Sequence, residues 1–348
     1  MAASTGSRDL QTLISIVIPA LNEQDNIGPL ERELAESLDG LPYDFEFVVI
    51  DNGSTDGTAA AVKLICARDP RWKYVRFSRN FGVEASISAG YKLASGEAIV
   101  VLYSDLQDPP QVIPAFLEKW REGFDVVYGV RTVRPGDAAW RNLTVKVVYG
   151  VIAALADVKI PRNAGDFRLI SRRVATALGS FNESNRYTRG LIAWLGFQQT
   201  GVEYQRRPRS SGESKAPIGS LIVFALNAFT SFSVKPLRIF TLLGFGLVAL
   251  SLLAVPVYVF LFLIGSPPAG ITTLIVLAFV GIGINSLGIG ILGEYLGRTY
   301  EETKRRPLYV VAESINIDIE TAHPPTEAEA TGRTTTRSPD EDGARATD

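Results

Sequence analysis

The chain has 348 residues, and its 35 basic and 37 acidic side chains nearly balance at a formal net charge of −2. The balance is uneven: residues 311–348 contain nine acidic and three basic side chains, so residues 1–310, with 32 basic and 28 acidic ones, carry +4. A charge this small, with no basic stripe interleaved with aromatic side chains, excludes a nucleic-acid-binding domain. The single cysteine, Cys66, and the single histidine, His323, exclude an internal disulfide and a thiolate metal site, and they argue against a histidine base.

Short apolar runs alternate with segments of helical spacing over the first 130 residues or so. We expect strands at 13–19, 45–50, 74–77, 98–103 and 125–128. We expect helices at 26–38, from the turn at 51–57 through Cys66, at 83–94, and from the prolines at 109–110 to about 123. This alternation predicts right-handed βαβ units and a mostly parallel sheet. Ligands of such sheets bind beyond the carboxyl ends of the strands, where Asp51 and Asp105 lie in the sequence.

Residues 239–293 form a run of 55 positions without Asp, Glu, Lys or Arg. The run is long enough for two membrane spans, at about 237–264 and 271–296, joined by an uncharged turn at 265–268. A buried pair of soluble helices is the alternative. Basic residues on both sides of the run predict that both termini face the cytoplasm.

These features divide the chain into five parts. They are an N-terminal tail (1–12), an α/β catalytic domain (13–219), an interfacial helix (220–236), the two-helix hairpin (237–297) and a cytoplasmic tail (298–348), disordered after about 321.

Three clusters with acidic residues follow predicted strands, at 19–23, 51–57 and 104–110. Taken singly, each cluster could have a purely structural role, because Asp and Gly often end strands and begin turns. Together at one rim of a parallel sheet, their carboxylates repel one another unless a cation or a hydroxyl-rich ligand joins them. A hard divalent cation that carries a diphosphate would meet this requirement.

The same clusters carry a family resemblance. The chain resembles family 2 glycosyltransferases with a GT-A fold, in particular the polyprenyl-phosphate group that includes bactoprenol glucosyltransferases and dolichol-phosphate mannose synthases. The matching stretches are IVIPALNE (16–23), VVIDNGSTDGT (48–58), RNFG (79–82), SDLQDPP (104–110), GDFRLISRRV (165–174), RYTRGLIAWLGF (186–197), SGESK (211–215), FSVKPLR (232–238) and GEYLGRTYEETKRRP (293–307). The first two recur across the whole family, whereas SDLQDPP, GDFRL and SGESK with the terminal hairpin are more specific.

The resemblance implies roles for individual residues on the donor side. The nucleotide pocket would be lined by Pro19, Asn22, Glu23, Asp51, Ser104 and Asp105, with Asp51 accepting hydrogen bonds from the base or ribose. Asp105 and Gln107 would hold Mg²⁺ or Mn²⁺ against the donor diphosphate. The chain departs from the family at Tyr103, because relatives usually have an acidic residue there. The metal site would then rest on Asp105, Gln107 and the diphosphate alone.

On the acceptor side, the resemblance makes Asp166 of GDFRL the candidate for the carboxylate at the reacting centre. Asp166 could instead cap a helix or pair with Arg168. A phosphate monoester has a second pKa near ~6 and is already ionised at neutral pH, so Asp166 could orient the acceptor rather than remove a proton. The acceptor phosphate would be bound by Arg131, Arg141, Arg209, Ser214 and Lys215. For Arg206 and Arg207 we favour attraction to anionic lipid headgroups.

The function that the resemblance implies is inverting, metal-dependent transfer of a hexose from a sugar nucleotide to polyprenyl phosphate, making a lipid-linked donor for cell-envelope glycans. UDP-glucose is the first candidate donor, and a GDP-mannose-dependent mannose synthase is the alternative. A non-catalytic membrane scaffold that keeps a nucleotide-binding fold is a third interpretation. The enzyme would be a multi-pass plasma (inner) membrane protein with a cytoplasmic active site, and it could be a homo-oligomer.

Overall fold

The computed structural model describes residues 12–132 and 164–319, except for 182, 184–185, 208–239 and several positions between 241 and 269. Within this part, eight strands form one sheet in the order β7-β5-β6-β4-β1-β2-β3-β8. The strands are β1 (Leu13–Ala20), β2 (Asp44–Asp51), β3 (Trp72–Phe77), β4 (Ala98–Val101), β5 (Val126–Arg131), β6 (Ala164–Ser171), β7 (Gln199–Tyr204) and β8 (Val311–Ile315). Two of them, β6 and β8, run antiparallel to their neighbours, and the other pairings are parallel. The prediction of a mostly parallel sheet is confirmed.

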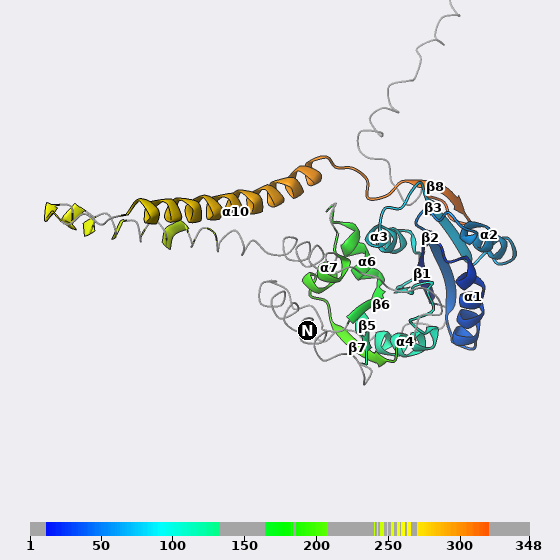
Figure 1. The fold of residues 1–348 in the computed structure, drawn as a ribbon. Coiled ribbons are helices and arrows are strands. Elements are labelled where there is room, and N and C mark those ends of the chain that lie inside the picture. Colours follow the sequence, from blue (N-terminus) through cyan, green and yellow to red (C-terminus); the bar gives the residue numbers. More distant parts are fainter. Residues whose placement is uncertain are drawn as a thin grey trace, which may run out of the picture.

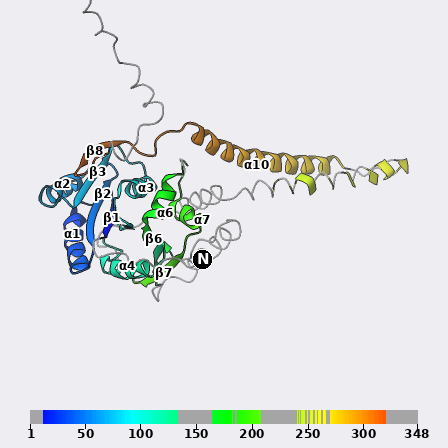
Figure 2. The same ribbon diagram turned by 180° about the vertical axis from the view of Figure 1, so that it is seen from behind.

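Helices cover both faces of the sheet (Figures 1 and 2). One face packs against α1 (Gln24–Leu38), α2 (Thr58–Arg68) and α4 (Ile113–Arg121), and the other against α3 (Val83–Leu93), α6 (Arg172–Gly179) and α7 (Thr188–Trp194). Alternate residues of the central strands supply the two apolar cores; in β1, for example, Ile16 faces one core and Val17 the other. Burial on both faces explains why β1, β2 and β4 are apolar throughout instead of alternating.

The five predicted strands and the four predicted helices of the first 130 residues are present, with ends shifted by a few residues. Strand β6 was not predicted, and it runs antiparallel between β4 and β5 in the middle of the sheet. Strands β7 and β8, which form the two edges of the sheet, were not predicted either.

The C-terminal part contains one long helix and a returning strand. Helix α10 (Ile271–Thr303) extends away from the sheet domain, and β8 then pairs with β3 (Figure 1). Among the residues that the structure describes, no helix combines the length and the apolar character needed to cross a membrane. The hairpin at 237–297 therefore stays a prediction, and much of its first span, like the interfacial helix at 220–236 and the tail from 320 onward, lies outside the described residues.

Candidate active site

The loops after β1, β2 and β4 meet at one edge of the sheet. Ala20 at the end of β1 is in register with Asp51 at the end of β2, and the Ser104 hydroxyl donates a hydrogen bond to the carbonyl of Pro19 at 3.0 Å. The structure thus brings together the side chains that the sequence predicted around a nucleotide. Such an edge, formed by the carboxyl ends of parallel strands, is where open α/β sheets bind their ligands.

The carboxylate of Asp51 is fully buried at this edge, where it holds the turn that follows β2. One oxygen accepts a hydrogen bond from the backbone N–H of Ser54 at 2.7 Å, and the other accepts one from the Tyr74 hydroxyl at 2.6 Å. The Arg76 guanidinium lies 3.8 Å away. Asp51 therefore fixes the turn that follows β2, in addition to any contact with a nucleotide.

That turn is tied to the loops on either side. The amide oxygen of Asn22 accepts a hydrogen bond from the N–H of Thr55 at 2.8 Å, and the N–H of Glu23 donates to the Thr58 hydroxyl at 2.8 Å. Gly53 has a φ of +80°, and a Cβ there would lie 2.7 Å from the backbone carbon of Arg79, so only glycine fits. A cavity of about 790 Å³ opens beside the turn, between the end of β3 and strand β8.

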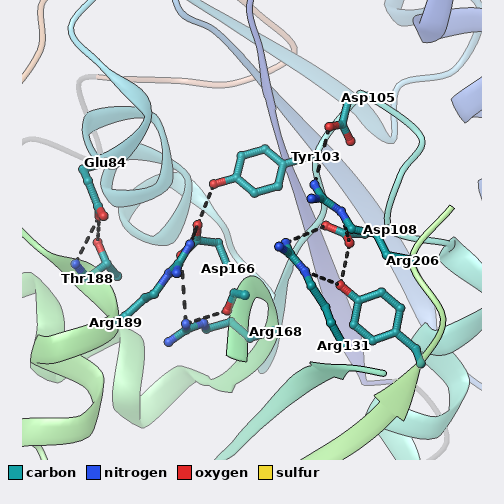
Figure 3. Close-up of polar contacts among 12 residues, drawn as sticks. Glu84, Tyr103, Asp105, Asp108, Arg131, Asp166, Arg168, Thr188, Arg189 and Arg206 are labelled. Carbon is teal, nitrogen blue, oxygen red and sulfur yellow. Dashed lines mark hydrogen bonds and ion pairs between the residues drawn. The ribbon is translucent and has the colours of Figure 1, made fainter. Parts of the chain in front are cut away.

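Asp105 and Asp108, from the loop after β4, lie next to two arginines (Figure 3). The carboxylate of Asp108 is fully buried, accepts a hydrogen bond from the Tyr204 hydroxyl at 2.5 Å, and lies 4.0 Å from Arg131. Arg206 approaches both carboxylates: its Nε is 3.3 Å from Asp108 and its Nη2 is 3.8 Å from Asp105. Asp105 is the more accessible of the two, with 22% of its side chain exposed.

The donor groups at this edge suit a hard cation, because carboxylate and amide oxygens are the ligands that Mg²⁺ and Mn²⁺ prefer. The Asp105 side chain is partly exposed, and the buried Gln107 follows two residues later. No group of three His, Cys, Asp or Glu side chains converges as a metal site in the described ranges. The residues therefore fit an ion that takes its other ligands from a bound diphosphate.

Asp166, in β6, is held by groups from α7, from the loop after β4 and from β6 itself (Figure 3). Arg189, in α7, donates from Nε and Nη2 to the two carboxylate oxygens at 2.5 Å each, and the Tyr103 hydroxyl donates to Oδ2 at 2.9 Å. The Arg168 guanidinium lies 3.9 Å from Oδ1. Glu84 accepts hydrogen bonds from the backbone N–H and hydroxyl of Thr188, at 3.1 and 2.5 Å, and so caps the start of α7. Asp166 lies inside a strand, so it does not form the helix cap considered as an alternative, whereas the alternative pairing with Arg168 is present beside the closer ion pair with Arg189.

These contacts set the ionisation of Asp166. Burial alone would raise its pKa, but the hydrogen bonds and charge of Arg189, the charge of Arg168 and the Tyr103 hydroxyl outweigh it and hold the pKa below the ordinary value. The pKa of Tyr103 is raised, by burial and by the neighbouring Asp166 anion, so the phenol stays protonated and keeps donating. With both oxygens engaged by cationic or neutral donors, Asp166 is a poor proton acceptor at neutral pH.

We expect Asp166→Asn to lower the free energy of unfolding by about 3 kcal/mol, since it breaks a buried ion pair. Because the pKa of Asp166 is depressed in the folded state, its stabilisation is complete above the unfolded-state pKa and is lost only as the pH falls through the folded pKa. Urea unfolding from pH 3 to pH 8 should therefore show a constant difference from wild type above about pH 5 and a shrinking one below about pH 4. The same change at exposed Asp44 should have little effect, and a difference that disappears between pH 5 and 7 would mean that Asp166 titrates as a general base.

The predicted acceptor residues are placed only in part. Arg131, at the end of β5, donates from Nε to the Tyr204 hydroxyl at 3.2 Å and has about a third of its side chain exposed. The other four, Arg141, Arg209, Ser214 and Lys215, lie outside the described residues. The preference for lipid headgroups is not supported for Arg206 or Arg207. Arg206 faces Asp105 and Asp108, and Arg207 donates to both oxygens of Glu33 at 2.9 and 2.7 Å.

One residue of the site was missed from the sequence alone, and the partner of another was not predicted. Arg189 lies in the RYTRG stretch that carried the resemblance, but its position 23 residues after Asp166 gave no sign of pairing. Tyr103 was treated as a lost metal ligand, whereas the structure gives it a different partner, Asp166. The contact between Arg189 and Asp166 depends on how α7 packs against the start of β6, and the sequence alone gives no signal of that packing.

The fold and the site define an α/β protein with carboxylates and arginines gathered at the carboxyl edge of its parallel strands. Residues 15–179 match glycosyl transferase family 2. An uncharacterized glycosyltransferase of Bacillus subtilis is 39% identical over 313 residues, which is 90% of this chain and 96% of the relative. The chain belongs to glycosyltransferase family 2 and is a glycosyltransferase.

Two further proteins extend the comparison. A bactoprenol glucosyl transferase from a prophage of Shigella flexneri is 37% identical over 303 residues, covering 86% of this chain and 98% of its own. Among solved structures, the glucosyl-3-phosphoglycerate synthase of Mycobacterium tuberculosis matches 63% of this chain and 78% of its own at 20% identity and a TM-score of 0.41. That similarity is too low to carry its ligands over to this chain.

Proposed function

We propose that this enzyme transfers a hexose, with UDP-glucose as the first candidate donor, to a polyprenyl phosphate. The observation that carries the proposal is the 37% identity to bactoprenol glucosyl transferases over 86% of the chain and 98% of their length. The identity extends beyond the sheet domain, so it includes the apolar C-terminal part as well as the loops around Asp51, Asp105 and Asp166. A sheet domain with these loops, joined to an apolar C-terminal part, favours a lipid phosphate as the acceptor.

On the donor side, the loops after β1 and β2 would bind the nucleoside, and Asp105 would hold a divalent ion against the diphosphate. Such an ion, when bound, stabilises the negative charge that develops on the leaving diphosphate. Asp105 suits this role because its side chain is accessible, while the neighbouring Asp108 is fully buried and serves Tyr204 and Arg131. Ser104 and Pro19 keep the β4 loop against the β1 loop.

On the acceptor side, the lipid phosphate oxygen forms the new bond to the anomeric carbon as the bond from that carbon to the nucleoside diphosphate breaks. A single displacement of this kind inverts the anomeric centre. The acceptor is already ionised at neutral pH, so the reaction needs no strong base. Asp166, held by Arg189 and Tyr103, suits a positioning role: it keeps the Arg189 guanidinium in place, where a phosphate could be bound.

We also propose that the apolar C-terminal part places the active site at the cytoplasmic face of the plasma membrane. Large apolar side chains are exposed along α10, including Leu274, Leu277, Ile282, Leu287 and Leu292. Exposed apolar surface of this extent marks a contact with another protein or with a membrane. A membrane is favoured here because the proposed acceptor is a lipid.

The test of the function is a transfer assay with a panel of labelled sugar nucleotides. Membranes that contain the protein and polyprenyl phosphate are offered UDP-glucose, GDP-mannose and other donors, and label is counted in the organic-extractable lipid. We expect label from UDP-glucose and none without the protein. Label from GDP-mannose instead would assign the enzyme as a mannose synthase. No transfer from any donor, by a protein that still binds nucleotide, would favour the non-catalytic scaffold.

The membrane topology has its own test. If residues 237–297 form a hairpin with both ends in the cytoplasm, Ser266→Cys should react with a membrane-impermeant thiol reagent added to intact cells, and Ser338→Cys should not. The native Cys66 is buried, so it adds little background. The opposite labelling pattern would place the active site away from cytosolic sugar nucleotides and would contradict the proposed orientation.

A further inference from the structure

We propose that Arg206 is the resident counter-ion of Asp105, and that a divalent cation reaches Asp105 only together with the donor diphosphate, displacing Arg206. The inference deepens the proposed function and rests on it for the identity of the diphosphate ligand. It concerns the order in which the ion and the nucleotide bind, which follows from the charges around Asp105.

The first step is the direction of Tyr103. The phenol does not face Asp105. Its hydroxyl donates to Asp166 at 2.9 Å, and Figure 3 shows the side chain pointing from the β4 end toward Asp166. Tyr103 therefore adds no negative charge beside Asp105 and uses its hydroxyl to hold a different carboxylate.

The second step concerns the other nearby carboxylate, Asp108. It has no exposed surface, and its Oδ1 already accepts the Tyr204 hydroxyl at 2.5 Å. Arg131 and Arg206 lie 4.0 and 3.3 Å from its oxygens. A hydrated ion cannot reach this carboxylate without disrupting a buried cluster, which leaves Asp105 as the one accessible carboxylate of the described β4 loop.

The third step is the position of Arg206. Its Nη2 lies 3.8 Å from Oδ2 of Asp105, and about a third of its side chain is exposed. The next residue fixes its backbone, because the N–H of Arg207 donates to the carbonyl of Gln107 at 2.9 Å. This main-chain hydrogen bond of the neighbouring residue holds Arg206 beside the loop of Asp105.

The charges decide the outcome. Among the described residues, the two negative charges of Asp105 and Asp108 lie beside the two positive charges of Arg131 and Arg206, so these four side chains together carry no net charge. A free divalent ion at Asp105 would compete with the Arg206 guanidinium for the same oxygen and would be repelled by it. A diphosphate brings negative charge and oxygen ligands. It therefore compensates for the loss of the Asp105–Arg206 pair, and the displaced guanidinium can bind the diphosphate in place of Asp105.

The experiment measures Mn²⁺ binding to the purified full chain, using the electron paramagnetic resonance signal of free Mn²⁺, with and without UDP or GDP. We expect wild type to bind Mn²⁺ at least about ten-fold more tightly when its cognate nucleotide is present. We expect Arg206→Gln to tighten Mn²⁺ binding in the absence of nucleotide by about ten-fold. This factor is the effect expected from repulsion between a single positive charge and a divalent cation several ångströms apart in a water-exposed site. Asp105→Asn defines the background from other acidic residues.

Two matched variants separate charge from structure. Arg206→Lys keeps a cation and should bind nucleotide-free Mn²⁺ as weakly as wild type. Arg207→Gln removes the adjacent arginine, whose guanidinium contacts Glu33 and Gln111, and should also match wild type. Equal Mn²⁺ affinity of wild type with and without either nucleotide, or an unchanged affinity in Arg206→Gln, would overturn the proposal. A nucleotide-coupled Mn²⁺ site in a protein that transfers no sugar to lipid would instead refute only the proposed function.

Discussion

We expect Asp105→Asn to reduce sugar transfer to lipid by at least about a hundred-fold, while the protein stays folded. Asparagine has the shape of aspartate but no charge, so the variant removes the accessible carboxylate of the described loop directly after β4, whose other carboxylate, Asp108, is fully buried. The carboxylate would anchor a divalent ion on the donor diphosphate, and the loss falls on the step in which the diphosphate departs. The assay counts labelled hexose in extracted lipid at saturating Mg²⁺ or Mn²⁺.

The matched control is Asp25→Asn, the same substitution at an exposed position in the first turn of α1. It should leave transfer unchanged. Circular dichroism and the unfolding midpoint should be close to wild type for both variants, because within the described residues the Asp105 side chain accepts a 3.2 Å hydrogen bond from the N–H of Gln107 and forms a 3.8 Å ion pair. Near-normal turnover by Asp105→Asn at saturating metal would remove Asp105 from the ion site.

The sequence predicts the parallel strands β1, β2 and β4 well because these strands are buried on both faces. Continuous apolar runs such as those that became β1, β2 and β4 have few other stable placements in a folded domain. The position of Asp51 at the end of its strand, and of Asp105 in the loop just after β4, follows from the same reasoning. It places both side chains at one edge of the sheet, as the structure shows.

The partners of Asp166 could not be predicted in this way. Strand β6 contains Asp166 and the buried Arg168, so it lacks the apolar signal of a central strand. Its place between β4 and β5 depends on antiparallel pairing with strands that begin at Ala98 and Val126, and such pairing is set by tertiary contacts. Arg189 then reaches Asp166 from α7, a contact that depends on how that helix packs on the sheet.

Strand β8 is the clearest case of information that local sequence does not contain. Val311–Ile315 is short and contains a glutamate and a serine, and it pairs with β3, whose residues lie more than 230 positions earlier. The segment fell beyond the last family-like stretch and was assigned to the cytoplasmic tail. In the structure β8 forms the edge of the sheet next to the turn after β2, and Ala312 and Glu313 line the adjacent cavity.

This placement of β8 predicts opposite outcomes for two truncations. Ending the chain after Ala322 removes only residues that follow the described strand, and we expect transfer and stability to be unchanged. Ending it after Leu308 removes β8 and Tyr309, whose ring stacks on the nearly fully buried Phe77 with centroids 4.8 Å apart. We expect this shorter protein to lose roughly 3 kcal/mol of unfolding free energy from lost apolar and aromatic contacts. The unfolding midpoint should fall by roughly 6–12 °C.

A point variant separates loss of the strand from the general effect of shortening the chain. The Asn316 side-chain amide donates to the carbonyls of Cys66 and Trp72 at 3.0 and 2.9 Å, and so fastens the end of β8 to the last turn of α2 and the start of β3. Asn316→Ala should therefore destabilise the full-length protein by about 1–3 kcal/mol, in the same direction as the shorter truncation. Thermal unfolding and sugar transfer are measured for the two truncated proteins and for Asn316→Ala. If the chain that ends after Leu308 unfolds at the wild-type temperature and transfers sugar at the wild-type rate, β8 contributes neither to the stability of the sheet nor to the neighbouring donor site.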